Sequence, residues 1–215
     1  MKQVSTESMG TRPLLPLIMS LSSPIMLSLL VQSLYNIIDS VYISHYDGNG
    51  LTALSLAFPV QTLITAVASG TGAGTNIIIA KALGANDSEN ASSTAFNGFV
   101  LSLINWSFFV IIGILILKPY FSIFTANTEV ASLGLKYLNI ILLFSIAPFT
   151  ENVAVRILQA TGNTFMPMIF QSAAALLNLL LDPIFIWGFG VIPAMGNSGA
   201  AIATVLSQFL SAALA

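Results

Sequence analysis

The chain has 215 residues, of which 56% are hydrophobic and only 7% are charged, with a formal net charge of −2. Soluble domains carry roughly 25% charged residues, so six basic and eight acidic side chains cannot cover a water-exposed surface. The lack of a basic cluster excludes nucleic acid as a partner. The lack of cysteine excludes disulfides, thiolate metal ligands and thiol catalysis.

Six apolar stretches each reach the roughly 20 residues that a helix needs to cross a bilayer. Short polar segments separate them. The sequence therefore predicts an all-α integral membrane protein, a six-transmembrane-helix bundle with helices at about 15–43, 53–80, 95–117, 133–157, 165–190 and 199–215. The last stretch has no hydrophilic tail, so we expect residues 1–215 to form one lobe of a larger protein.

The basic residues predict how the bundle lies in the membrane, because Lys and Arg favour the cytoplasmic side. A cytoplasmic N-terminus places four of the six basic residues inside and two outside. We therefore expect a multi-pass protein of the plasma (inner) membrane with its N-terminus in the cytoplasm. The inner set is Lys2, Arg12, Lys81 and Arg156, and the outer set is Lys118 and Lys136.

Polar residues recur at helical spacing inside three of the apolar stretches. Residues three, four or seven positions apart lie on one face of a helix, and such a face cannot point at lipid. The stripes consist of Gln32, Tyr35, Asn36 and Asp39 in the first helix, Asn178 and Asp182 in the fifth, and Thr204 and Gln208 in the sixth.

The two acids, Asp39 and Asp182, are the strongest candidates for function. An unpaired charge at the centre of a membrane helix costs about 2.5 to 3.5 kcal/mol, and no Lys or Arg lies at comparable depth in the predicted helices. Such an acid binds either a proton or a metal cation held with neighbouring oxygens. The neutral amides and hydroxyls have a structural alternative, since these groups commonly hydrogen-bond between membrane helices.

Helix-breaking residues occur in the same stretches. Proline removes a backbone hydrogen bond and bends a helix, and transporters place substrate and ion sites beside such breaks. Glycines within "SGTGAG" (69–74) predict close helix packing. The prolines are Pro24, Pro59, Pro148, Pro167 and Pro183.

Three further residues are candidates for the membrane interface. Glu151 is predicted to lie there, near Arg156, and Trp106 and Trp187 are either interfacial anchors or packing residues.

Four segments together resemble the multidrug and toxic compound extrusion (MATE) family of transporters. "SSPIMLSLLVQSLYNIIDSVYIS" resembles its first helix, and "GTGAGTNIIIAKALGANDSENA" its second helix and the following loop. "RILQATGNTFMPM" resembles the connection from the fourth helix to the fifth. "LNLLLDPIFIWGFGVIPAMGNSGAAIATVLSQ" resembles the fifth and sixth helices, with a slightly longer connection than in some members.

The resemblance implies about twelve helices in two six-helix lobes of a MOP-superfamily transporter, with only the amino-terminal lobe in these residues. It implies a cation site for H⁺ or Na⁺ at Asp39, Asn178, Asp182 and Thr204. Tyr35 lies one turn before Asp39, and Pro24 is the proline associated with bending the first helix. Gln32, Asn36 and Gln208 are candidates to line the substrate cavity.

We therefore expect a cation-coupled antiporter that exports amphipathic organic, often cationic, compounds, with no cofactor besides the coupling ion. Its expected partners are small-molecule substrates, the lipid bilayer and a carboxy-terminal lobe. One alternative is a flippase of the same superfamily that moves lipid-linked oligosaccharides, which would favour a cationic cavity for pyrophosphate. An intramembrane aspartyl protease is a distant alternative, because such enzymes carry Gly-x-Gly-Asp before one acid, whereas Asp182 follows three leucines.

Overall fold

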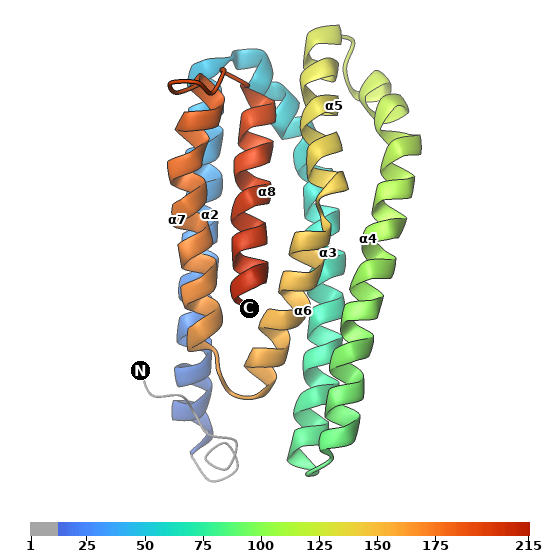
Figure 1. Ribbon diagram of the computed structural model, residues 1–215, viewed down its shortest axis with the longest axis vertical. Coiled ribbons are helices and arrows are strands. Elements are labelled where there is room, and N and C mark those ends of the chain that lie inside the picture. The colour runs from blue at the N-terminus through green and yellow to red at the C-terminus, as the bar shows by residue number, and fades with distance from the viewer. Residues whose placement is uncertain (1–12) are drawn as a thin grey trace.

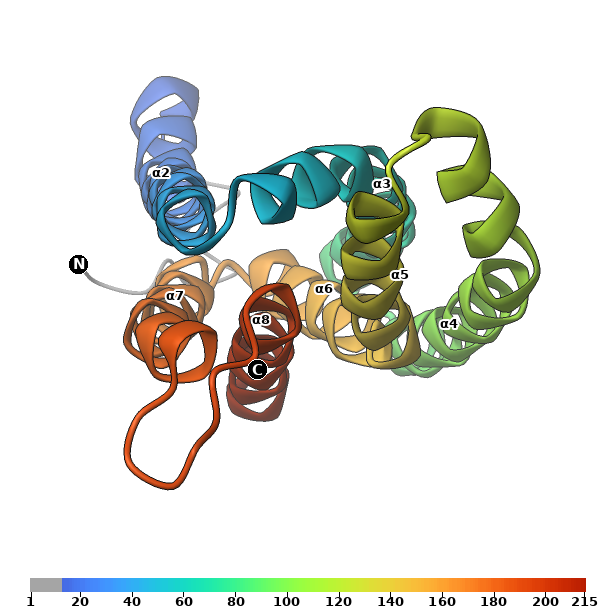
Figure 2. The same cartoon turned by 90° about the horizontal axis from the view of Figure 1, so that it is seen from above.

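The computed structural model describes residues 13–215, and helices make up almost all of this part of the chain. The helices run side by side along one long axis (Figure 1), and the view from above shows α7 packed between α2 and α8 (Figure 2). Lys2 and Arg12 lie outside the described residues. The helices are α2 (Leu14–Tyr46), α3 (Gly48–Gly84), α4 (Ser88–Phe124), α5 (Thr128–Leu143), α6 (Ile146–Ala160), α7 (Phe165–Trp187) and α8 (Asn197–Leu214).

Two of the helices extend well beyond the apolar stretches that predicted them. α3 begins at Gly48 and α4 runs from Ser88 to Phe124, because polar residues outside the apolar stretch cap them and continue the helix. The Asp47 side chain accepts a hydrogen bond from the backbone N–H of Asn49, at 3.0 Å. Asp87 accepts two bonds from Asn90, which hold the pKa of the Asp87 carboxyl below its usual range. Apolar length thus predicts the membrane-crossing part of a helix but not its ends.

Four helices in the described residues are long and apolar enough to cross a membrane, namely α2, α3, α4 and α7. A fifth span is formed if α5 and α6 count as one bent helix. The sixth predicted span, α8, is not among them, since Asn, Gln and several Ser side chains lower its hydropathy. α8 nevertheless packs against α5, α6 and α7 within the bundle.

The predicted fourth helix is two helices, α5 and α6, that meet at an angle of 45°. The chain leaves the helix after Leu143, and Pro148 follows in the first turn of α6, where a missing N–H is tolerated. Side chains of α4 bond to backbone carbonyls on both sides of the break. Trp106 donates to the carbonyl of Leu143 at 3.0 Å, and Ser102 donates to that of Phe149 at 3.1 Å. Trp106 therefore has a structural role at this break.

Glycines allow the closest helix contacts. A Cβ at Gly72 would come within 3.0 Å of the carbonyl oxygen of Asn152 on α6, which confirms the predicted close packing for that residue of "SGTGAG". Gly70 and Gly74, in contrast, have open space beside them. At the other contact, a Cβ at Gly199 of α8 would overlap the backbone of Phe185 on α7.

A buried amide also joins two helix ends, and it leads to a test of stability. Asn197 is 1% exposed and donates to the carbonyl of Gly50 at 2.8 Å. Replacing Asn197 with Ala is expected to lower the free energy of unfolding by about 1 to 2 kcal/mol, because a buried hydrogen bond is lost. The melting temperature of the full-length protein in detergent measures this effect. Asn49→Ala is the matched control, since Asn49 bonds to Glu129 at the exposed surface; equal losses in both variants would contradict the prediction.

Candidate functional site

Three helices bring their polar stripes together inside the bundle. Asp39 of α2, Asn178 and Asp182 of α7, and Thr204 of α8 are all buried, and Asp182 has no exposed surface at all. The spacing of four between Asn178 and Asp182 places both on the side of α7 that faces α2 and α8. The four residues predicted for cation binding are therefore all withdrawn from lipid.

Asn178 is the central hydrogen-bonding group of this cluster. Its side-chain nitrogen lies 3.3 Å from Oδ1 of Asp182 and 3.4 Å from Oγ1 of Thr204. With the amide rotated, the nitrogen donates to Oδ2 of Asp182 at 3.2 Å and the oxygen accepts from the backbone N–H of Thr204 at 3.3 Å. In both orientations Asn178 connects the acid of α7 to α8.

Asp39 completes the cluster from α2, but its hydrogen bonding is incomplete. Asp39 lies on α2, which packs against α7, the helix that carries Asp182. Oδ1 of Asp39 is buried and has no hydrogen-bond partner in the described residues. A buried oxygen without a partner is costly, and a bound proton or small cation would remove that cost. The oxygens of a carboxyl, an amide and a hydroxyl are the ligands that hard cations prefer.

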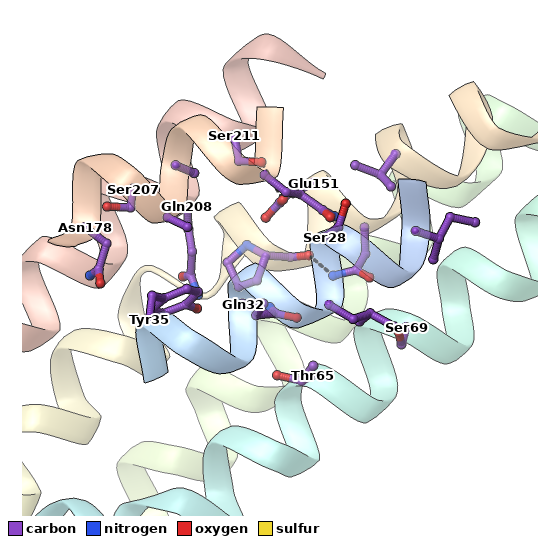
Figure 3. A pocket seen from close by; sticks show the side chains of 18 of the residues that line it. Ser28, Gln32, Tyr35, Thr65, Ser69, Glu151, Asn178, Ser207, Gln208 and Ser211 are labelled. Atoms are coloured by element: carbon purple, nitrogen blue, oxygen red, sulfur yellow. Dashed lines mark hydrogen bonds between the residues drawn. The ribbon is translucent and has the colours of Figure 1, made fainter. Parts of the chain in front are cut away.

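A cavity of about 200 Å³ lies beside the cluster, between α2, α3, α6, α7 and α8. Tyr35 and Asn178 lie toward one end of it, and Glu151 and Ser69 toward the other (Figure 3). The cavity lining contains both polar and apolar side chains, which suits an amphipathic ligand. The predicted residues that line the cavity are Gln32, Tyr35, Asn178, Thr204 and Gln208.

The other predicted residues do not line this cavity. Asp39 and Asp182 are buried next to it. Asn36 is exposed and lies outside it, because one residue after Tyr35 the side chain is rotated by about 100° around the helix axis. Pro24 is buried within α2, one turn before the cavity residue Ser28, whose hydroxyl donates to the Pro24 carbonyl at 3.1 Å.

Glu151 is a cavity residue that the sequence interpretation missed. We expected an interfacial acid, but its carboxyl lies in the cavity wall and accepts a hydrogen bond from Ser211 of α8 at 2.5 Å (Figure 3). Arg156, which the sequence placed at the inner end of its helix, also lines the cavity and donates to Gln159 at 3.0 Å. A helical stripe in the sequence could have revealed this wall: Pro148, Glu151, Asn152, Val155, Arg156 and Gln159.

The described residues contain no group of three or more His, Cys, Asp or Glu side chains that could hold a metal ion. The buried cluster is built from two carboxyls, an amide and a hydroxyl, and it adjoins a cavity of mixed polarity. Such an arrangement, in a bundle whose helices are long enough to cross a membrane, indicates a binding site inside an integral membrane protein.

Comparison with known proteins identifies the family. The MatE family model matches residues 24–184, and the chain belongs to the MatE family of multidrug and toxic compound extrusion transporters. Three relatives are each 28% identical: a FAD transporter of Shewanella oneidensis, the probable multidrug resistance protein NorM of Thermotoga maritima, and the multidrug export protein MepA of Staphylococcus aureus. These alignments cover 94%, 92% and 93% of this chain and 45%, 42% and 44% of the relatives.

Solved structures show the same fold. An outward-facing multidrug resistance MATE transporter of the MOP superfamily matches with a TM-score of 0.85 and 34% identity over 92% of this chain and 43% of that chain. A MOP-superfamily transporter from Pyrococcus furiosus, described as having a binding pocket of reverse polarity, matches equally well. An inward-facing MATE transporter matches with a TM-score of 0.79 and 31% identity over 88% and 44% of the two chains. The chain therefore spans less than half the length of these relatives, as expected for one lobe.

Proposed function

We propose that the chain is the amino-terminal, six-helix lobe of a cation-coupled antiporter that exports amphipathic organic compounds. The observation that carries this proposal is a pair of buried acids, Asp39 and Asp182, with an unpartnered oxygen and a cavity beside them. The acids take up the coupling ion, H⁺ or Na⁺, together with Asn178 and Thr204. The cavity takes the exported compound.

In the proposed mechanism, ion binding and substrate export are coupled because the two acids lie behind the cavity wall, whereas the substrate occupies the cavity itself. Asp39 and Asp182 do not line the cavity, whereas Tyr35 and Asn178 do. Ion binding changes the charge behind the cavity wall and biases a bend of α2 near Pro24 that narrows the cavity. An ion shifts such a balance only by its difference in affinity for the two states, and a difference of about 1.4 kcal/mol changes the ratio tenfold.

Glu151 supports a preference for compounds with a positive group. Its carboxyl faces the cavity, and its hydrogen-bond partner is the neutral hydroxyl of Ser211. An ammonium group in the cavity would therefore find an acid whose charge is not already balanced by that partner. Two observations favour a second candidate function, the transport of an anionic substrate. Arg156 lines the cavity, and one relative is a FAD transporter. A flippase of the same superfamily that moves lipid-linked sugars would also have an anionic substrate.

An intramembrane protease receives less support than either transporter. Catalysis by two acids requires both carboxyls to reach the scissile bond. Asp182 has no exposed surface, and neither acid lines the cavity.

Transport under an imposed gradient tests the proposal. The full-length protein in sealed vesicles is expected to export a cationic dye when a proton or sodium gradient is applied, and the gradient that drives export identifies the ion. Vesicles treated with an ionophore that collapses the gradient are the control. Export that continues at the same rate without any ion gradient would overturn the antiport mechanism.

Glu151→Gln is expected to weaken binding of a cationic dye about tenfold, because the amide keeps the size of the side chain but removes its charge. Binding of a neutral amphipathic dye is expected to change little. Fluorescence titration of the purified full-length protein measures both affinities. Glu89→Gln, at an exposed position in the first turn of α4, is the control; an equal loss for both dyes would remove Glu151 from charge recognition.

A further inference from the structure

The connection between α7 and α8 has an unusual composition for an exposed loop. It reads "GFGVIPAMG", residues 188–196, and no charged residue occurs between Pro183 and the last residue, Ala215. Loops that face water are normally polar, whereas every side chain of this one is apolar.

The loop nevertheless has a defined shape. Phe189 and Ile192 exchange two backbone hydrogen bonds, each of 3.1 Å, to form a tight hairpin. Gly188 and Gly190 have φ of 82° and 62°, a region that glycine enters at little cost. The segment that returns toward α8 is held against the last turn of α7, since the N–H groups of Met195 and Gly196 donate to the carbonyls of Phe185 and Ile186. The backbone therefore holds the tip of the loop in one position.

That position leaves the apolar side chains uncovered. Phe189 is 75% exposed and Val191 is 100% exposed. The view from above shows the loop directed sideways, away from the helices (Figure 2), and the side view shows it at the level where α7 ends (Figure 1). Because apolar surface is unfavourable in water, the exposed Phe189 and Val191 side chains favour an apolar or interfacial environment around the hairpin.

Aromatic residues surround the base of the loop. The rings of Tyr42 and Trp187 meet edge to face, with centroids 5.4 Å apart. A Cβ at Gly196 would come within 2.7 Å of the Tyr46 ring, so that ring packs against the end of the loop. Trp and Tyr gather at the level of the lipid headgroups, and Trp187 is the last residue of the membrane-spanning helix α7. The base of the loop thus lies where the bilayer boundary is expected.

We propose that the α7–α8 loop, residues 188–196, is a membrane-interface anchor whose tip, Phe189 to Ile192, inserts into the boundary between lipid headgroups and acyl chains. Its sideways direction, lack of charge and aromatic base all match an interfacial segment. The anchor fixes the depth of the end of α7, the helix that carries Asn178 and Asp182 in its preceding turns. This inference is independent of which compound or ion is transported.

A fluorescent label at the tip tests the anchor. Residues 1–215 contain no cysteine, so Val191→Cys gives a unique labelling site once any cysteine outside these residues is replaced. Val191 has no covered surface, and a label there disturbs no packing. The full-length protein carries an environment-sensitive dye at this position in vesicles that contain lipids spin-labelled near the headgroup. Ala126→Cys, in the exposed polar connection between α4 and α5, is the matched control.

Lipid quenching at position 191 is expected to exceed that at position 126 by about threefold, together with blue-shifted emission and weak quenching by aqueous iodide. Strong iodide quenching at both positions would place the tip in water and overturn the proposal. Protection of position 191 from both quenchers would show that another part of the protein covers it, which would also overturn the proposal.

Discussion

Asp182→Asn in the full-length protein is expected to reduce gradient-driven export by about a hundredfold or more, which corresponds to two tenfold steps in a coupling equilibrium. Asp182 has no exposed surface, and Asn178 is its hydrogen-bonding neighbour. The Asn side chain has the same shape as Asp, so packing is retained. However, it can neither take up a proton at this site nor balance a cation with its charge.

The location of Asp182 adds a second readout to this experiment. Because it does not line the cavity, the affinity for a dye measured without a gradient is expected to stay within about twofold of the wild-type value. A loss of export with retained dye affinity therefore separates coupling from substrate binding. Glu89→Gln, which also removes one negative charge but at the exposed start of α4, controls for net charge. Undiminished gradient-driven export by Asp182→Asn at normal abundance would contradict the assignment.

The buried cluster could be predicted from the sequence because polar and charged residues stand out within the apolar stretches that form membrane helices. A carboxyl at lipid depth needs a reason, and helical spacing alone brought Asn178 and Asp182 onto one face of α7. The structure adds the link to Thr204, which spacing within one helix cannot show. Asn36 illustrates the limit of the method: it lies one turn after the cavity residue Gln32, yet it is exposed and does not line the cavity.

The wall formed by α6 was missed for a different reason. Pairing Glu151 with Arg156 along the sequence made both look interfacial, whereas their hydrogen-bond partners are Ser211 and Gln159. The break before α6 was also hidden, because the apolar run continues through it. The groups that stabilise the break, Trp106 and Ser102, come from α4. For Glu151 and for the break, partners from distant segments thus decided what the local sequence left open, whereas Arg156 bonds within its own helix.

Gly199→Val is expected to lower the free energy of unfolding by about 3 kcal/mol or more, since an overpacked contact costs most where it cannot relax. The added side chain would overlap the backbone carbonyl of Phe185 on α7. A backbone group cannot rotate away as a flexible side chain can, so α7 and α8 must move apart. That movement would also separate Asn178 from Thr204, whose 3.4 Å contact spans the same two helices.

Gly74→Val is the matched control for this overpacking. Gly74 lies within α3 and has open space where a Cβ would be added, so its replacement should leave stability unchanged or raise it by up to about 1 kcal/mol. The melting temperatures of both full-length variants in detergent give the comparison. If Gly199→Val and Gly74→Val had the same melting temperature, the contact between α7 and α8 would not be close enough to hold Thr204 against Asn178. Because the cluster depends on that contact, export by a folded fraction of Gly199→Val should fall even when measured per mole of folded protein.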